Sequence, residues 1–221
     1  MIVVHHLAYG RSQRVLWLLE ELGVPYEVVA YERMPNHKAP PSLLKVHPLG
    51  KAPVVDDTEE GVVLGESAAI ITYLLQKYGP KQTTSPEAAL DDLYYTHYAE
   101  STLVPLIINN QRLSRLTNRA PWYLRPLFRY VFGFYRELYI DPDFPRNCKM
   151  VEEHLSKNPW FARGSDRPTA ADYAMLRGLG GLVTDKIATA ETYPSIVKYV
   201  EKIHARPAYQ VALRRGDERT K

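Results

Sequence analysis

Glu66 and Ser67 open a predicted helix and could bind a charged ligand. Free backbone N–H groups and the positive end of the helix dipole form an anion site at such a helix start. A ligand carboxylate fits this position, and the Glu66 carboxylate could pair with an adjacent ammonium group. The pair therefore suits an amino-acid head group. The alternative is that Ser67 only caps the helix.

A second segment, Gly50-Lys51-Ala52-Pro53-Val54, places a proline at the start of a predicted strand. Proline cannot donate to a sheet, so it is tolerated at the first position of a strand. A cis Ala52–Pro53 bond would turn the backbone N–H and C=O of Ala52 outward, where they could pair with an extended peptide. A trans bond would make Pro53 an ordinary strand start. Both interpretations stay open at this point.

A third segment, Tyr9-Gly10-Arg11-Ser12, lies between the first predicted strand and the first predicted helix. It holds two hydroxyl groups and a guanidinium group at a helix N-terminus, where a thiolate is stabilised. The alternative is that Ser12 caps the helix and Arg11 is solvated.

The elements that position these segments alternate between strand and helix. Apolar residues recur at Val15, Leu18, Leu19 and Leu22, which is typical of a helix that ends at Gly23. The pattern predicts strands at 2–7, 26–31, 53–55 and 62–64, and helices at 10–23 and 66–78. An irregular connection is expected at 34–41. This order suits a small sheet with helices packed on it.

The rest of the chain reads as helical. The expected helices cover 86–118, 122–154, 169–179, 194–205 and 207–214, and the second of them is interrupted near Pro142 and Pro145. We therefore predict a first domain over residues 1–80, a linker over 81–86, and an all-helical domain over 87–221.

Composition narrows the class of protein. A net charge of +3 comes from 28 basic and 25 acidic residues mixed along the chain, which argues against nucleic acid as a partner. No apolar run is long enough to span a bilayer, so no membrane association is expected. A single cysteine, Cys148, argues against a disulfide framework, and the first residues do not resemble a secretory signal. We expect a cytoplasmic protein.

The order and spacing of these segments resemble the cytosolic glutathione transferase family, in particular its fungal and bacterial branch. The matching segments are RSQRVLWLLEELGVPYE, HPLGKAPVV, LGESAAIITYL and the HYAE segment at 97–100. Residues 167–172 resemble the buried N-capping box of the family, in which Thr169 and Asp172 bond to each other's backbone. The resemblance implies an α+β, thioredoxin-like first domain followed by an all-α helical bundle.

The resemblance also implies a glutathione site. Ala52 would offer its backbone to the cysteinyl part of glutathione beside a cis Pro53, and Glu66 and Ser67 would hold the γ-glutamyl end. The glycine carboxylate would face basic side chains, namely Lys51 with His37 or Lys38.

The group that activates the glutathione thiol departs from the family pattern. Family members use Tyr, Ser or Cys near the end of the first strand, and no cysteine is present there. Alignment on the first helix places Tyr9 at the catalytic serine of some classes, and close relatives carry Ser where this chain has Gly10. Tyr9 and Ser12 are both candidates, with Arg11 as electrostatic support.

The implied function is conjugation of glutathione to hydrophobic electrophiles, with reduction of organic hydroperoxides as a further reaction. The second substrate is expected between the domains, against Tyr98, Ser101, Thr102 and Leu106 of the first long helix. For each of these the alternative is a place in the core or a dimer interface. The resemblance further implies a homodimer without a metal. A non-catalytic module that binds ligands or proteins is the competing function.

Overall fold

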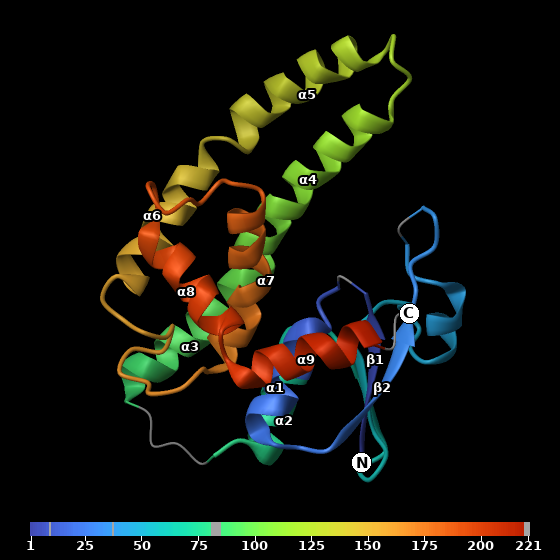
Figure 1. The fold of residues 1–221 in the computed structure, drawn as a ribbon, viewed down its shortest axis with the longest axis vertical. Coiled ribbons are helices and arrows are strands. Elements are labelled where there is room, and N and C mark those ends of the chain that lie inside the picture. The colour runs from blue at the N-terminus through green and yellow to red at the C-terminus, as the bar shows by residue number, and fades with distance from the viewer. Residues whose placement is uncertain (9, 37, 81–84, 219–221) are drawn as a thin grey trace.

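The structure is a computed structural model that describes residues 1–8, 10–36, 38–80 and 85–218 (Figure 1). A sheet with its helices occupies one end of the molecule, and a taller group of helices occupies the other. The predicted combination of a thioredoxin-like domain and an all-helical domain is confirmed. The predicted boundaries at 80 and 86 stay predictions, and linker residues 81–84 lie outside the described residues.

The sheet has four strands in the order β2-β1-β3-β4, and they are β1 (Ile2–Leu7), β2 (Tyr26–Tyr31), β3 (Val54–Asp57) and β4 (Val62–Gly65). β1 pairs with β2 in parallel and with β3 antiparallel, and β3 pairs antiparallel with β4. Strand β1, one of the two inner strands, is almost entirely buried. This sheet holds the segments before β3 and after β4 side by side.

Helix α1 (Gln13–Leu22) lies between the sheet and the helical domain. Apolar residues on more than one of its sides are therefore buried. Its residues 14–19 are all buried. The helix ends at Gly23, whose φ of 63° is the left-handed conformation that glycine adopts without a Cβ clash. Helix α2 (Ser67–Tyr78) follows β4 directly, so its N-terminus faces the loop that enters β3.

The helical domain consists of α3 (Pro86–Tyr98), α4 (Val104–Arg119), α5 (Arg125–Tyr139), α6 (Asp143–Leu155), α7 (Ala170–Thr184), α8 (Pro194–His204) and α9 (Pro207–Glu218). A single π turn, η2 (Ala99–Leu103), joins α3 to α4, so the predicted helix over 86–118 forms with one irregular turn. The predicted break near Pro142 separates α5 from α6. A short 3₁₀ helix, η1 (Pro41–Lys45), follows the predicted irregular connection.

Helix α7 forms the centre of the helical domain and begins at the predicted capping box. The Asp172 carboxylate accepts hydrogen bonds from the Thr169 backbone N–H at 2.8 Å and from the Phe161 N–H at 3.1 Å, and it also accepts the Tyr199 hydroxyl. Burial raises the pKa of Asp172 to about 6. Asp172 therefore ties the start of α7 to the preceding loop and to α8.

The two domains are joined by packing that the last helix completes. Helix α9 returns from the helical domain and lies beside α1 (Figure 1). The Trp17 ring lies 4.5 Å from that of Tyr173 and 6.0 Å from that of Tyr209, measured between centroids. Glu21 on α1 pairs with Arg206, which lies between α8 and α9. These contacts fix α1 against the helical domain.

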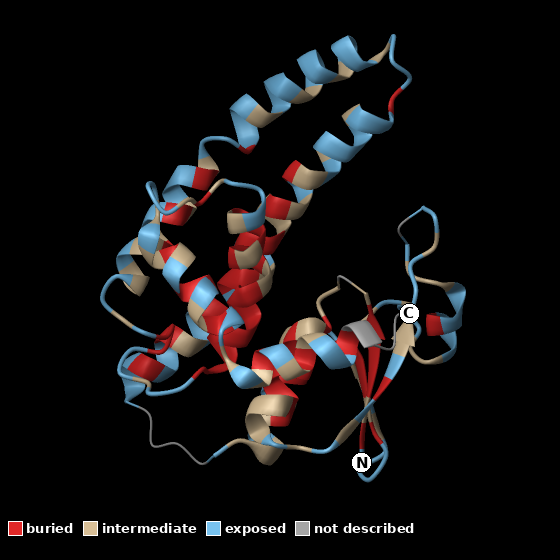
Figure 2. Cartoon of the chain, viewed as in Figure 1, coloured by how far each residue is buried: buried red, intermediate tan, exposed pale blue. Residues whose placement is uncertain are grey.

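Helices α4 and α5 extend away from the rest of the molecule as a hairpin. Figure 2 shows the far part of this hairpin mostly in the colour of exposed residues, and α5 has no buried residue. Among the described residues, no helix is long and apolar enough to cross a bilayer.

Candidate functional site

A small cavity at the junction of the sheet and α2 brings six of the predicted site residues together. They are Arg11, Lys51, Ala52, Pro53, Glu66 and Ser67. His47 and Leu49 of the loop before β3 and Gly65 at the end of β4 complete the described lining. The sheet topology explains this meeting, because β3 and β4 are paired neighbours and the site lies where β3 begins and β4 ends.

Ala52 supplies unpaired backbone groups to this cavity. The Ala52–Pro53 bond is cis, as the family resemblance implies. The ladder between β1 and β3 begins at Val54, and the backbone of Ala52 makes no hydrogen bond to any described residue. One N–H and one C=O are therefore free to pair with an extended peptide, as a neighbouring strand would.

Glu66 has an unusual backbone conformation and a free carboxylate. Its φ is 65°, a region that costs a residue with a Cβ about 1–3 kcal/mol. The side chain is exposed and forms no hydrogen bond or ion pair with any described residue. The preceding Gly65 is equally constrained, because a Cβ there would lie 3.1 Å from the His47 ring. This turn presents a free negative charge at the start of α2.

Ser67 is held by a buried ionic network that the sequence did not reveal. Arg14 on α1 is 1% exposed, and its guanidinium donates to the Ser67 hydroxyl at 2.7 Å and to the Ala174 carbonyl of α7 at 2.7 Å. It also pairs with Glu100, whose second oxygen lies 3.2 Å from Arg11. Burial lowers the pKa of Arg14, and the Glu100 charge opposes this shift. Arg14 is a positioning residue that joins α1, α2 and the helical domain.

Four predicted residues of the thiol and glycine ends are not among the described lining residues of this small cavity. Ser12 is fully buried, and its hydroxyl accepts the Leu7 N–H at 3.3 Å and lies 3.4 Å from the Leu7 carbonyl. That hydroxyl neither caps α1 nor lines the cavity. Lys38 is exposed, and its side chain is not among the described lining residues. Tyr9 and His37 lie outside the described residues.

A larger cavity of about 940 Å³ opens on the other side of Arg11, between the two domains. Its walls come from the start of α1, the segment after β2, one side of α4 and one side of α7. Six arginines belong to its described lining, namely Arg11, Arg14, Arg33, Arg112, Arg115 and Arg177. Two cavities that share Arg11 could hold two reactants side by side.

The four residues predicted for the second substrate do not belong to the described lining of this larger cavity. Tyr98 is 7% exposed and donates its hydroxyl hydrogen bond to Asn147 of α6, inside the helical domain. Ser101 and Thr102 are exposed at the π turn, and Leu106 packs against the core. The residues of α4 that line the cavity lie further along, beginning at Ile108. The helix expected over 86–118 does line the space between the domains, but through residues of α4, its second half.

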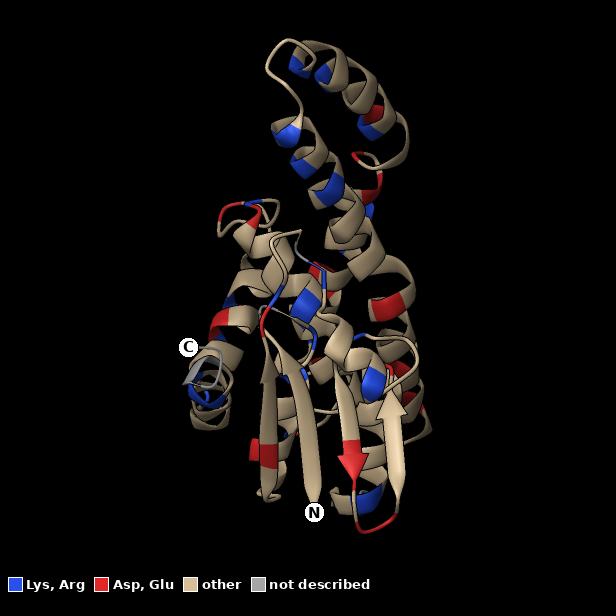
Figure 3. Ribbon diagram, turned by 90° about the vertical axis from the view of Figure 1, so that its right-hand side faces the viewer, with Lys and Arg blue, Asp and Glu red and all other residues tan. Residues whose placement is uncertain are grey.

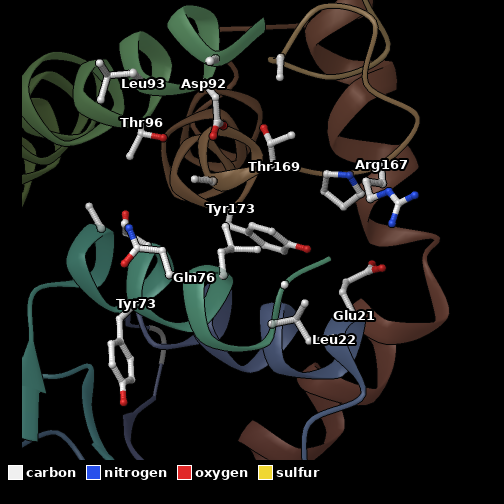
Figure 4. A pocket seen from close by; sticks show the side chains of 18 of the residues that line it. Glu21, Leu22, Tyr73, Gln76, Asp92, Leu93, Thr96, Arg167, Thr169 and Tyr173 are labelled. Atoms are coloured by element: carbon white, nitrogen blue, oxygen red, sulfur yellow. The ribbon is translucent and has the colours of Figure 1, made fainter. Parts of the chain in front are cut away.

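A further cavity of about 930 Å³ lies between α1 and α2 on one side and α3 and α7 on the other (Figure 4). Its charged groups have structural partners. Asp92 accepts the Ala171 N–H at 2.8 Å, and Glu21 pairs with Arg206. The Tyr73 ring points away from the cavity, and its hydroxyl bonds to Asp57. Of these bonds, the pair of Glu21 with Arg206 joins the two domains, and the other two lie within one domain each.

The described residues provide neither a metal site nor a reactive thiol. No group of three or more His, Cys, Asp or Glu side chains within them is arranged to hold a metal ion. Cys148 is fully buried, and burial raises the pKa of its thiol to about 11.

Both halves of the chain match family models. The model described as the N-terminal domain of glutathione S-transferase matches residues 5–82, and that of the C-terminal domain matches residues 134–210. Together with the fold and the cavity beside Ala52 and Glu66, these matches define the class of protein. The chain belongs to the glutathione S-transferase family.

Individual relatives agree with this assignment. The chain is similar to glutathione S-transferase 3 of Schizosaccharomyces pombe, at 34% identity over 223 residues, which covers 100% of this chain and 90% of the relative. It is 33% identical to glutathione S-transferase 1 of Saccharomyces cerevisiae over 217 residues, or 95% and 92% of the two chains. A crystal structure of a glutathione S-transferase from Actinobacillus pleuropneumoniae superposes with a TM-score of 0.71 at 30% identity, covering 98% and 93%.

Proposed function

We propose that the chain binds reduced glutathione in the cavity between Lys51, Ala52, Glu66 and Ser67. The observation that carries this proposal is the set of unpaired groups that meet there. Ala52 offers one backbone donor and one acceptor, Glu66 offers a free carboxylate, and the start of α2 offers N–H groups. These groups complement the cysteinyl amide, the ammonium and the carboxylate of a γ-glutamyl peptide. Lys51, with His37 or Lys38, would meet the glycine carboxylate.

Arg11 is the described residue best placed to stabilise the glutathione thiolate. It lines both the small and the large cavity, and its side chain is 34% exposed. A cysteine thiol has a pKa of about 8.5, and lowering it by about two units requires roughly 2.7 kcal/mol. A hydrogen bond to a charged group contributes about 1.5–3 kcal/mol, and a helix N-terminus adds up to about 2 kcal/mol. Tyr9 stays the hydroxyl candidate, because the Ser12 hydroxyl is occupied by Leu7.

The proposed reaction is transfer of this thiolate to an electrophile in the larger cavity. The thiolate sulfur forms a bond to the electrophilic carbon, the leaving group departs with its electron pair, and the thiol proton has already passed to solvent. In the further proposed reaction, two glutathione molecules reduce one hydroperoxide to an alcohol and water and form glutathione disulfide. Such chemistry would serve detoxification in a reducing compartment, which we propose is the cytoplasm.

A two-fold homodimer is part of this proposal. Large apolar side chains are exposed on α3, where Leu90 is 65% exposed and Leu93 is 57% exposed. Exposed apolar side chains that gather on one helix are typical of a surface that a partner covers. A second copy of the chain, paired through α3 and the neighbouring surface of α2, would bury them.

Calorimetry with reduced glutathione tests binding. Ultraviolet absorbance of the complex tests activation of the thiol, with S-methylglutathione, which has no free thiol, as the comparison. We expect saturable binding that weakens about tenfold in Glu66→Gln and in Lys51→Met, since each change removes a charged hydrogen bond. We expect the ultraviolet absorbance of the thiolate to appear in the complex and to diminish in Arg11→Met and Tyr9→Phe. Absence of saturation at millimolar glutathione would contradict the proposal. Binding without thiolate formation would favour the non-catalytic module instead.

A further inference from the structure

The larger cavity carries an unusual charge for a site that would take hydrophobic compounds. Its described lining includes six arginines and no aspartate or glutamate. They come from α1 and the turn before it, from the segment after β2, from α4 and from α7, so the fold gathers them from distant parts of the sequence. Figure 3 shows basic residues both along the α4–α5 hairpin and in the middle of the molecule above the sheet.

Only some of these charges are balanced by the protein. Glu100 pairs with Arg11 and Arg14, and these two guanidinium groups are thereby neutralised in part. Among the described residues, Arg115 donates only to the neutral amide of Gln111, at 3.4 Å. Arg112 makes no hydrogen bond or ion pair with any described residue.

Arg177 shows the imbalance most clearly. It lies on α7 and is partly buried, yet its guanidinium makes no hydrogen bond or ion pair with any residue that the structure describes. Burial lowers the pKa of Arg177, and the nearby guanidinium groups of Arg11, Arg115 and Arg33 lower it further. The negative charge of Asp185 acts in the opposite direction but does not outweigh them. A partly buried cation that faces other cations costs free energy unless an anion compensates for it.

We infer that the second substrate of this protein is an organic anion, an electrophile whose carboxylate, sulfonate or phosphate group binds to Arg177 and the neighbouring Arg112 and Arg115. Arginine presents a planar fork of donors that matches such groups in a bidentate manner. A volume of about 940 Å³ accommodates a whole aromatic acid, and Ile108, Leu176 and Tyr209 provide apolar surface for its body. This inference rests on the proposed function and narrows its hydrophobic electrophiles to those that carry a negative charge.

A matched pair of substrates separates charge from reactivity. A para-chloro-dinitrobenzoate and its methyl ester undergo the same reaction, in which the glutathione sulfur bonds to the ring carbon that carries chlorine and chloride leaves with the bonding electron pair. Each enzymatic kcat/KM is divided by the uncatalysed rate with glutathione. We expect the acid to be preferred over the ester, and we expect Arg177→Met and Arg112→Met each to reduce that preference about tenfold, or about 1.4 kcal/mol.

Two controls show whether a loss of preference comes from the cavity arginines themselves. Arg119→Met removes an arginine of the same helix, α4, that is not in the described lining, and it should leave the preference unchanged. Glutathione binding by calorimetry should be unchanged in all three variants, which shows that they fold. Arg112 is exposed, so its replacement leaves no buried gap.

Direct binding makes the inference testable even without turnover. Dinitrobenzoate without the chlorine is titrated into the glutathione complex, and we expect its Kd to rise about tenfold in Arg177→Met. Equal affinities in wild type and Arg177→Met, or a preference for the ester over the acid, would overturn the inference. Turnover of both substrates without an arginine effect would leave the proposed function standing, whereas binding of dinitrobenzoate without any conjugation would count against the proposed function alone.

Discussion

At the scale of single residues, the site depends on a few unsatisfied groups. Within the described part of the chain, the backbone N–H and C=O of Ala52 and the side-chain carboxylate of Glu66 have no hydrogen-bond or ion-pair partner. Folded chains rarely leave such groups unused without a functional reason. The positive φ of Glu66 supports the same conclusion, because the chain retains a side chain there that glycine would replace without strain.

Glu66 allows stability and binding to be separated. We expect Glu66→Gly to raise the free energy of unfolding by up to about 1 kcal/mol, because glycine adopts a φ of 65° freely. The same change should weaken glutathione binding about tenfold, since the ammonium group loses its partner. Urea unfolding and calorimetry measure the two effects. In the control Glu66→Gln, binding should weaken without the gain in stability. Unchanged binding in Glu66→Gly would remove Glu66 from the site.

At the scale of elements, α7 requires close approach by its neighbours. A Cβ on Gly178 would lie 2.5 Å from the side chain of Leu103, which is fully buried. A Cβ on Gly180, in the same helix, would meet nothing within 4 Å. The two glycines therefore have different roles in one helix.

Alanine substitutions in α7 should have opposite effects. Gly178→Ala is expected to lower the free energy of unfolding by about 1 kcal/mol, because overpacking exceeds the gain in helix propensity. Gly180→Ala should raise it by up to about 1 kcal/mol, since only the propensity changes. Urea denaturation of both variants measures the difference. Equal effects would mean that α7 does not pack against the π turn as closely as described.

Asp57 links β3 to α2, two elements that border the small cavity beside Ala52. Burial alone would raise its pKa, but hydrogen bonds from Lys77 and Tyr73 outweigh burial and lower the pKa to about 2. The ion pair therefore joins the end of the sheet to the last turns of α2.

This pair predicts a specific loss of stability in acid. The folded-state pKa of Asp57 lies below its unfolded value, so its contribution is complete above the unfolded pKa of about 3.9 and is lost as the pH falls towards 2. Thermal unfolding of wild type over this range should show the loss, and Asp57→Asn should flatten the curve. Asp56→Asn, on the same strand, is the matched control. A curve unchanged by Asp57→Asn would contradict the role of the pair.

At the scale of the whole molecule, two exposed apolar surfaces are candidates for an interface between copies of the chain. One is on α3, around Leu93, and the other is the α4–α5 hairpin, where Leu116 is 54% exposed. The proposed dimer uses the surface on α3, next to α2.

Sedimentation of charge variants distinguishes the two surfaces. Leu93→Arg should convert the proposed dimer to a monomer at micromolar concentration, because a buried unpaired charge at an interface costs several kcal/mol. Leu116→Arg should remain dimeric. A dimer that dissociates only in Leu116→Arg would place the interface on the hairpin, and a wild-type monomer would end the dimer proposal.

The sequence by itself determined the local structure and indicated the residues that line the small cavity beside Ala52. The apolar spacing of Val15 to Leu22 predicted α1, and the proline at 142 predicted the break between α5 and α6. Lys51, Ala52 and Glu66 could be grouped in advance because the order and spacing of their segments resemble those of the glutathione transferase family. Local chemistry of this kind is written in adjacent residues.

Only the tertiary structure decided which side chains face one another across the two domains. Periodicity indicates that a helix buries one side, but it does not indicate what covers that side. Tyr98 therefore packs against α6 rather than a substrate, and Ser12 bonds back to Leu7. The contact of Arg14 with Glu100, and the gathering of Arg33, Arg112 and Arg177 around one cavity, join residues 65 or more positions apart, which no local pattern relates. Their meeting depends on how the helical domain packs against α1.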